Sequence, residues 1–90
     1  MTYKYTVTET RTNPLIPFYL WPPRVRQLAM ELGRISIQGQ ESLTERITTS
    51  EWPSQAAWQA FRDHPEVNDE YLLMDQYNAK AKITFTKQEI

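Results

Sequence analysis

Both ends of the chain alternate between polar and apolar side chains with a period of two, which is the pattern of a β-strand with one buried face. In residues 2–12, tyrosine and valine side chains share one side, and threonine and lysine side chains share the other. Residues 81–89 repeat the pattern, with Ile83 and Phe85 on the apolar side. The sequence therefore predicts a strand at each end of the chain, and both strands need a covering layer on one face.

Three helical segments are predicted between these strands. The first spans residues 23–33, where Pro23 suits the opening turn and Gly33 suits the position just after the helix. The second spans residues 51–64 and stops before a proline, and a third piece covers about 68–79. The residues expected to cap the second and third helices are Ser50 or Ser54, and Asn68 or Asp69.

Residues 34–50 hold two short alternating runs separated by the Gln-Gly-Gln sequence at 38–40. A β-hairpin that turns at these three residues is the first interpretation. The alternative is one long strand with a bulge at Gly39.

The order of elements is β-α-β-β-α-(α)-β, which predicts an α+β, ferredoxin-like fold in a single domain of residues 1–90, with helices on one face of an antiparallel sheet. The face expected to lie against the helices carries Tyr5, Val7, Ile35, Ile37, Leu43, Ile47, Ile83 and Phe85. The other face carries Thr6, Thr8, Thr10, Ser36, Thr44, Arg46, Thr48, Thr84 and Thr86. This second face is polar but poor in charge, so it is suited to partial cover by a second sheet.

Residues 13–23 contain four of the six prolines and are therefore predicted to be irregular. They also carry Phe18, Tyr19 and Trp21, and a segment this apolar must pack on the body of the protein, on a ligand or on a partner. Together with Trp52, these aromatic residues are candidates for the wall of a ligand pocket. The alternative is that they only pack against one another.

Composition excludes several classes of function. The chain has no cysteine, which rules out disulfides, zinc-thiolate sites and a cysteine nucleophile, and favours a cytoplasmic location. The net charge is −1 with scattered basic residues, which argues against nucleic-acid binding. No apolar run approaches the roughly 20 residues of a membrane helix. The two glycines cannot form a phosphate-binding loop, and the acidic residues around Pro65 lack calcium-loop spacing, so no metal site is predicted.

Three features carry a resemblance to a known family: the end of the first strand near Asn13, the helix stop at Gly33, and the stretch Thr-Thr-Ser-Glu-Trp-Pro-Ser-Gln-Ala-Ala-Trp-Gln-Ala-Phe at 48–61. They resemble the dimeric α/β-barrel superfamily, which includes antibiotic-biosynthesis-monooxygenase-like and stress-responsive proteins. The motif differs from the family pattern at Gln55, where an acid is common.

The resemblance implies a homodimer whose two sheets pack through their threonine-rich faces, with ligands bound between the sheet and the helices of each subunit. The interface residues expected on that basis are Thr8, Thr44, Arg46, Thr48 and Thr84. An intersubunit partner for Arg46 would be Glu9 or Glu45.

Asn13, Trp58 and His64 resemble the residue set of the haem-degrading branch of this superfamily, although Trp58 and His64 are closer in sequence than in that branch. They are the candidate catalytic residues. The structural alternative places Trp58 in the core, Asn13 in a turn before Pro14, and His64 in the last turn of a helix. No cofactor is predicted, and haem is the alternative.

Three functions follow from these observations. The first is a small homodimeric accessory or ligand-binding protein without catalysis, favoured by the lack of a titratable constellation. The second is a monooxygenase-like or haem-linked enzyme of the superfamily. The third is a protein-interaction factor that uses the aromatic and proline-rich segment 14–23 and therefore exposes Phe18, Tyr19 or Trp21.

Overall fold

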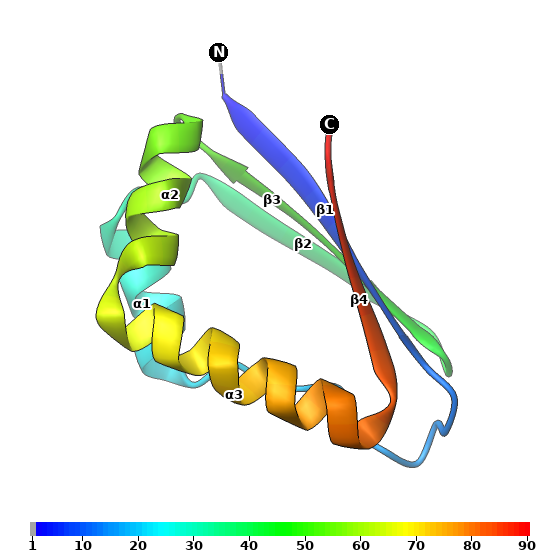
Figure 1. Ribbon diagram of the computed structural model, residues 1–90. Coiled ribbons are helices and arrows are strands. Elements are labelled where there is room, and N and C mark those ends of the chain that lie inside the picture. Colours follow the sequence, from blue (N-terminus) through cyan, green and yellow to red (C-terminus); the bar gives the residue numbers. More distant parts are fainter. Residues whose placement is uncertain (1) are drawn as a thin grey trace.

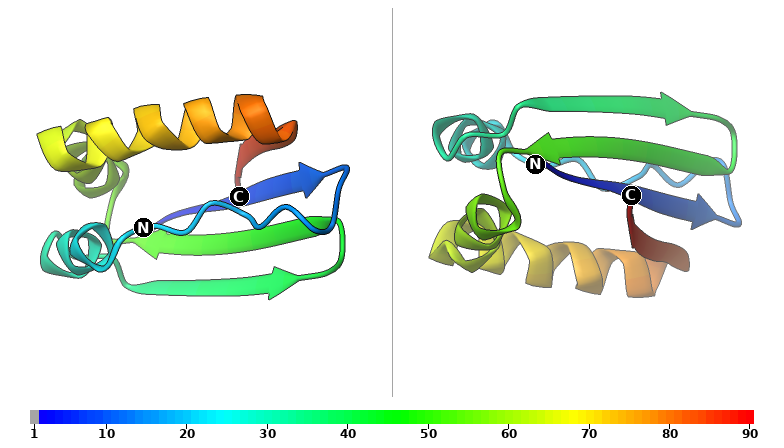
Figure 2. Two further views of the ribbon diagram at one scale, coloured as in Figure 1. Left: turned by 90° about the horizontal axis from the view of Figure 1, so that it is seen from below. Right: turned by 90° about the horizontal axis from the view of Figure 1, so that it is seen from above.

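The computed structural model describes residues 2–90 and places three helices on one side of a four-stranded sheet (Figures 1 and 2). In chain order the elements are β1 (Tyr3–Arg11), α1 (Pro23–Glu31), β2 (Ser36–Glu41), β3 (Glu45–Trp52), α2 (Gln55–Asp63), α3 (Pro65–Ala81) and β4 (Ile83–Glu89). The strand order is β2-β3-β1-β4, and all neighbouring strands are antiparallel. This arrangement confirms the predicted α+β, ferredoxin-like fold.

The register of the sheet decides which side chains face the helices. Tyr5 pairs with Ser50 across β1 and β3, and Glu9 pairs with Arg46 on one side and Phe85 on the other. Directly opposed residues point to the same face of a sheet. The face covered by the helices is therefore made of the odd-numbered residues of β1 and β4 and the even-numbered residues of β3.

The hairpin of residues 34–50 is confirmed, but its turn was predicted in the wrong place. Gly39 lies in the middle of β2, opposite Thr48, and the chain turns at residues 42–44 instead. Ser42 closes this turn: its backbone N–H donates to the Glu45 carbonyl at 2.8 Å, and its Oγ accepts from the Glu45 N–H at 3.2 Å.

The displaced turn reverses the predicted faces of β3, because a shift of one residue in pairing exchanges the two sides of a strand. Arg46 and Thr48 lie on the covered face, and Ile47 lies on the open face. Thr44 and Leu43 lie in the turn. Of the residues expected in the dimer interface, only Thr8 and Thr84 remain on the open face of the sheet.

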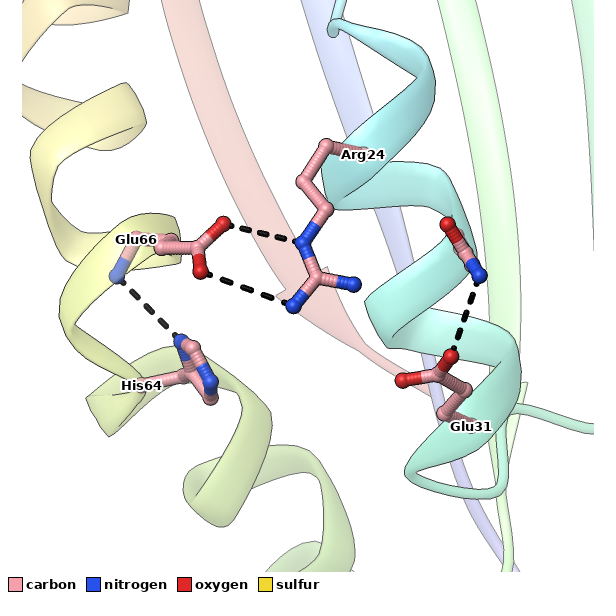
Figure 3. Close-up of polar contacts among 5 residues, drawn as sticks. Arg24, Glu31, His64 and Glu66 are labelled. Atoms are coloured by element: carbon pink, nitrogen blue, oxygen red, sulfur yellow. Dashed lines mark hydrogen bonds and ion pairs between the residues drawn. The ribbon is translucent and has the colours of Figure 1, made fainter.

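The helix ends follow local chemistry. Gly33 adopts φ of +101° just after α1, which a glycine accommodates without strain. Ser54, one of the two predicted caps, accepts from the Ala57 N–H at 3.1 Å at the start of α2. Nδ1 of His64 accepts from the Glu66 N–H at 3.2 Å, so His64 caps α3, which begins at Pro65 rather than at 68 (Figure 3).

The main core lies between the helices and the end of the sheet where β3 runs into α2. It is built by Tyr5, Val25, Leu28, Ala29, Trp52, Phe61 and Val67. A second, smaller cluster joins Phe18 of the irregular segment to Ala81 and Ile83. Within residues 2–90, none of the helices combines the length and the apolar character needed to cross a bilayer.

Candidate functional site

A cavity of about 330 Å³ lies between the covered face of the sheet and the layer formed by the helices and the irregular segment. Its floor comes from the strands, and its walls come from the three helices and from residues 19–21. Its lining residues are Tyr5, Val7, Glu9, Tyr19, Leu20, Trp21, Val25, Arg26, Arg34, Ile37, Arg46, Thr48, Ser50, Phe61, Tyr71 and Phe85. A volume of this size accommodates a small organic molecule.

An ion pair crosses the floor of the cavity between β1 and β3. The Arg46 guanidinium donates from Nε and Nη2 to the two carboxylate oxygens of Glu9, each at 2.9 Å. The Glu9 side chain is 4% exposed and that of Arg46 is 15% exposed, so the pair is largely removed from water. Arg46 Nη2 also donates to the Tyr19 carbonyl at 2.9 Å and thereby ties the wall to the floor.

The wall is aromatic. Trp21 lies between Tyr19 and Tyr71, with ring centroids 6.0 Å and 4.9 Å away in edge-to-face arrangements. The Tyr19 hydroxyl donates to Glu70 at 2.5 Å, and the Tyr77 hydroxyl donates to the Pro17 carbonyl. These bonds hold the irregular segment beside α3, where it runs back along the sheet (Figure 2).

The charges around the cavity are unbalanced. Three arginines (Arg26, Arg34 and Arg46) line it against one carboxylate, Glu9, so the lining charge is 3 − 1 = +2. Since Arg46 and Glu9 compensate each other, the surplus belongs to Arg26 and Arg34. The cavity therefore combines an aromatic wall with an excess of positive charge.

The structure brings some predicted ligand residues to the cavity and not others. Tyr19 and Trp21 line it. Phe18 is buried in the smaller core cluster with the Arg11 guanidinium 4.2 Å from its ring, and Trp52 is fully buried in the main core. In the irregular segment the exposed large side chains are Leu15 and Leu20 rather than the aromatic ones, so the aromatic display predicted for a protein-interaction segment is absent from residues 14–23.

Asn13, Trp58 and His64 do not come together. Asn13 follows the end of β1, where its Oδ1 accepts from the Leu15 N–H at 3.0 Å. Trp58 packs at the opposite end of β1 against Tyr3, and Nζ of Lys87 lies 3.5 Å from the Trp58 ring. Neither these two nor His64 lines the cavity. Among residues 2–90, no three His, Cys, Asp or Glu side chains gather where they could hold a metal ion.

Arg34, Tyr71 and Glu9 are cavity residues that the sequence prediction did not identify as ligand contacts. Glu9 has the same parity as Tyr5 and Val7, and a charge on the apolar side of a strand was a usable signal of a buried pair. Arg34 and Tyr71 gave no local signal, because their positions depend on how α1 and α3 pack.

Burial raises three tyrosine pKa values from 10.0 to about 12: those of Tyr19 and Tyr71, which line the cavity, and that of Tyr3, which does not. Desolvation is the largest cause of each shift. The hydrogen bond that the Tyr19 hydroxyl donates to Glu70 raises the pKa of Tyr19 further. The native state therefore retains protons that the unfolded chain releases above pH 10. We expect full stability below pH 10 and a progressive loss as the pH rises to about 12.

Ultraviolet titration of tyrosinate, together with urea unfolding at several pH values, tests this expectation. Tyr19→Phe should weaken the pH dependence, because it removes one of the three groups. Ionisation of Tyr19 in the folded protein with an ordinary pKa would contradict the assignment.

No protein-family model and no curated protein matches the sequence. Solved structures share its fold at low identity. A mutant of SnoaB, a cofactor-independent oxygenase from Streptomyces nogalater, superposes with a TM-score of 0.63 and 7% identity over 99% of this chain and 90% of that chain. A protein from Deinococcus radiodurans proposed to be an antibiotic biosynthesis monooxygenase gives a TM-score of 0.58 and 13% identity over 100% of this chain and 90% of that chain.

A conserved protein of unknown function from Bacteroides thetaiotaomicron, described as a possible oxidoreductase, gives a TM-score of 0.58 and 13% identity. The match covers 99% of this chain and 97% of that chain. At these identities the likeness is one of fold. The chain has the fold of antibiotic-biosynthesis-monooxygenase-like α/β-barrel proteins, as the sequence resemblance implied.

Proposed function

We propose that the protein binds a small, largely aromatic molecule in the cavity between its sheet and its helices. The cavity itself carries this proposal, because protein interiors are close-packed and a space of this volume is otherwise filled with side chains. Its wall of Tyr19, Trp21 and Tyr71 suits a planar ring, and the polar floor suits a few oriented hydrogen bonds.

Calorimetric titration with 2-naphthamide, a neutral bicyclic probe, tests the proposal. Thr48→Phe places a ring in the cavity floor, where it takes up space that the probe would occupy. It should weaken binding by about tenfold or more, which corresponds to about 1.4 kcal/mol of binding free energy. Thr44→Phe makes the same change in the exposed turn and should leave binding unchanged. Equal binding by both variants would place the probe outside the cavity and contradict the proposal.

A second candidate function is oxygenation of the bound molecule without a bound cofactor. It is favoured by the likeness of the fold to SnoaB, whose activity is of this kind. The cavity lies where the family resemblance implies that ligands bind, and an aromatic substrate would be enclosed by the same wall.

Oxygen uptake with 1-naphthol as the probe tests this candidate. The protein is first treated with a chelator, and wild type is compared with Thr48→Phe. The expected product is 1,4-naphthoquinone: one atom of O2 enters the ring, and the other leaves as water with the two hydrogen atoms that the substrate loses. Uptake by wild type that the cavity variant loses, with formation of this product, supports oxygenation. Uptake no greater than that of buffer would leave a binding role.

We propose in addition that two copies of the chain pair through the open face of the sheet. None of the described helices covers this face (Figure 1), which presents Thr6, Thr8, Ile47, Thr49 and Thr84. The face is rich in β-branched residues, with Ile47 near its middle and the charged residues Lys4, Glu45 and Glu51 toward the strand ends. Such a surface is suited to packing against a copy of itself.

Light scattering after size exclusion tests the pairing. Ile47→Lys puts two like charges into a symmetric interface and should convert a dimer into a monomer. Thr44→Lys, in the turn, is the matched control and should remain dimeric. A monomeric wild type would contradict the proposal. Arg46 was expected in the interface but lies in the cavity floor, so a substitution at Arg46 would not test the pairing of the open faces.

A further inference from the structure

Arg34 has an unusual position among the arginines of the cavity. It follows Gly33 directly after α1, and its backbone N–H donates to the Ala29 carbonyl at 3.0 Å, which fixes the start of its side chain. The residue is half-buried and lines the cavity. Within residues 2–90, its guanidinium forms neither an ion pair nor a hydrogen bond.

The other arginines nearby are occupied or exposed. Arg46 is held by both oxygens of Glu9 and by the Tyr19 carbonyl. Arg24 of α1 pairs with Glu66 of α3 at 3.1 Å on the surface (Figure 3). Arg26 lines the mouth of the cavity but is exposed to water. Arg34 is therefore the one half-buried guanidinium of the described lining that has all its side-chain donors free.

Removal of this charge from water is unfavourable, and desolvation lowers the pKa of Arg34. A guanidinium stays protonated in proteins, so Arg34 does not avoid this cost by losing its proton. A hydrogen-bond acceptor in the cavity would offset the unfavourable desolvation. Two tyrosines, Tyr5 and Tyr71, line the same cavity, and their hydroxyls form no hydrogen bond with any residue of 2–90. Tyr5 lies close enough to interact electrostatically with both Arg34 and Tyr71.

We propose that Arg34 recognises a carboxylate on the aromatic ligand, with the hydroxyls of Tyr5 and Tyr71 as additional donors. This inference rests on the proposed binding function and narrows its ligand to aromatic carboxylates. The planar guanidinium fork matches the two oxygens of a carboxylate, and the pairing is strongest where water is excluded. The aromatic wall then holds the ring, and Arg34 sets which end of the ligand enters.

Calorimetric titration of 2-naphthoate against its neutral analogue 2-naphthamide tests the inference. Wild type should bind 2-naphthoate about 10- to 100-fold more tightly, as expected for a charge-assisted hydrogen bond in a partly dry site. Arg34→Met should abolish this preference, by weakening the binding of 2-naphthoate far more than that of 2-naphthamide. Arg34→Lys should retain part of it, which keeps the test valid if the methionine variant is unstable.

Arg26→Met is the matched control, because it removes a positive charge from the exposed mouth of the same cavity. It should reduce the preference by less than about threefold, as a screened surface charge does. Equal affinity of wild type for the two probes, or loss of the preference in Arg26→Met but not in Arg34→Met, would overturn the role of Arg34 while the binding function stands. Failure of both probes to bind would overturn the binding function itself.

Discussion

Replacing Trp52 by alanine is expected to lower the free energy of unfolding by about 3–5 kcal/mol. Trp52 is 0% exposed and its ring lies 5.1 Å from that of Phe61, so the substitution leaves a hole where β3 meets α2. A domain of this length has a total stability of about 5–13 kcal/mol, of which this loss is a large share. Urea unfolding measures this loss, provided that the variant and the wild type share the same m-value, which is the slope of the unfolding free energy against urea concentration.

Two companion variants separate the causes. Trp52→Phe should cost about 1–2 kcal/mol, because it removes less volume and also removes Nε1, which is buried without a hydrogen-bond partner. Trp21→Ala should destabilise less than Trp52→Ala, since Trp21 is only partly buried and one side of it faces the cavity. A cost below about 1 kcal/mol for Trp52→Ala would show that this end of the core is loosely packed.

The elements that could be predicted from the sequence are those with a strong local signal. Alternation identified β1 and β4 to within two residues at each end, and Pro23 with Gly33 bounded α1. The third helix was predicted to start at 68 because Asn68 and Asp69 resemble caps. The structure caps it with His64 instead, and Pro65 occupies its first turn, as proline commonly does.

The hairpin shows where local reasoning fails. Residues 45–49 were grouped correctly into two alternating sets, but Ile47 was assigned to the covered face because it is apolar. In the structure the covered face of β3 is polar from Arg46 to Ser50, since Arg46, Thr48 and Ser50 form the floor of a cavity rather than part of the core. Hydrophobicity alone therefore selects the wrong face beside a polar cavity, which is where a sequence is least consistent with simple core packing.

The residues of the candidate site also divide into those with a local sequence signal and those without one. Tyr19 and Trp21 were identified because an aromatic segment rich in proline must pack on something. Arg34 reaches the cavity from the segment that follows α1, and Tyr71 reaches it from α3. No spacing rule links two such residues before the helices are packed. The residues that would give the site its charge could thus be found only from the fold.

Glu9→Ala is expected to destabilise the protein by about 3 kcal/mol or more, because it leaves the Arg46 guanidinium without its carboxylate in a largely buried position. The double variant Glu9→Ala with Arg46→Met should recover much of that loss, since two apolar side chains tolerate this environment better than one unpaired charge. Urea unfolding of the wild type, the two single variants and the double variant gives the coupling free energy between the two residues.

The same set of variants tests whether the ion pair also shapes the ligand site. Arg46 holds the Tyr19 carbonyl, so the double variant frees that part of the wall even where stability is restored. We therefore expect the double variant to unfold nearly like the wild type but to bind 2-naphthamide more weakly, by about tenfold. Wild-type affinity in the double variant would show that Tyr19 is held in place by Glu70 and Trp21 alone, and that Arg46 serves only to neutralise Glu9.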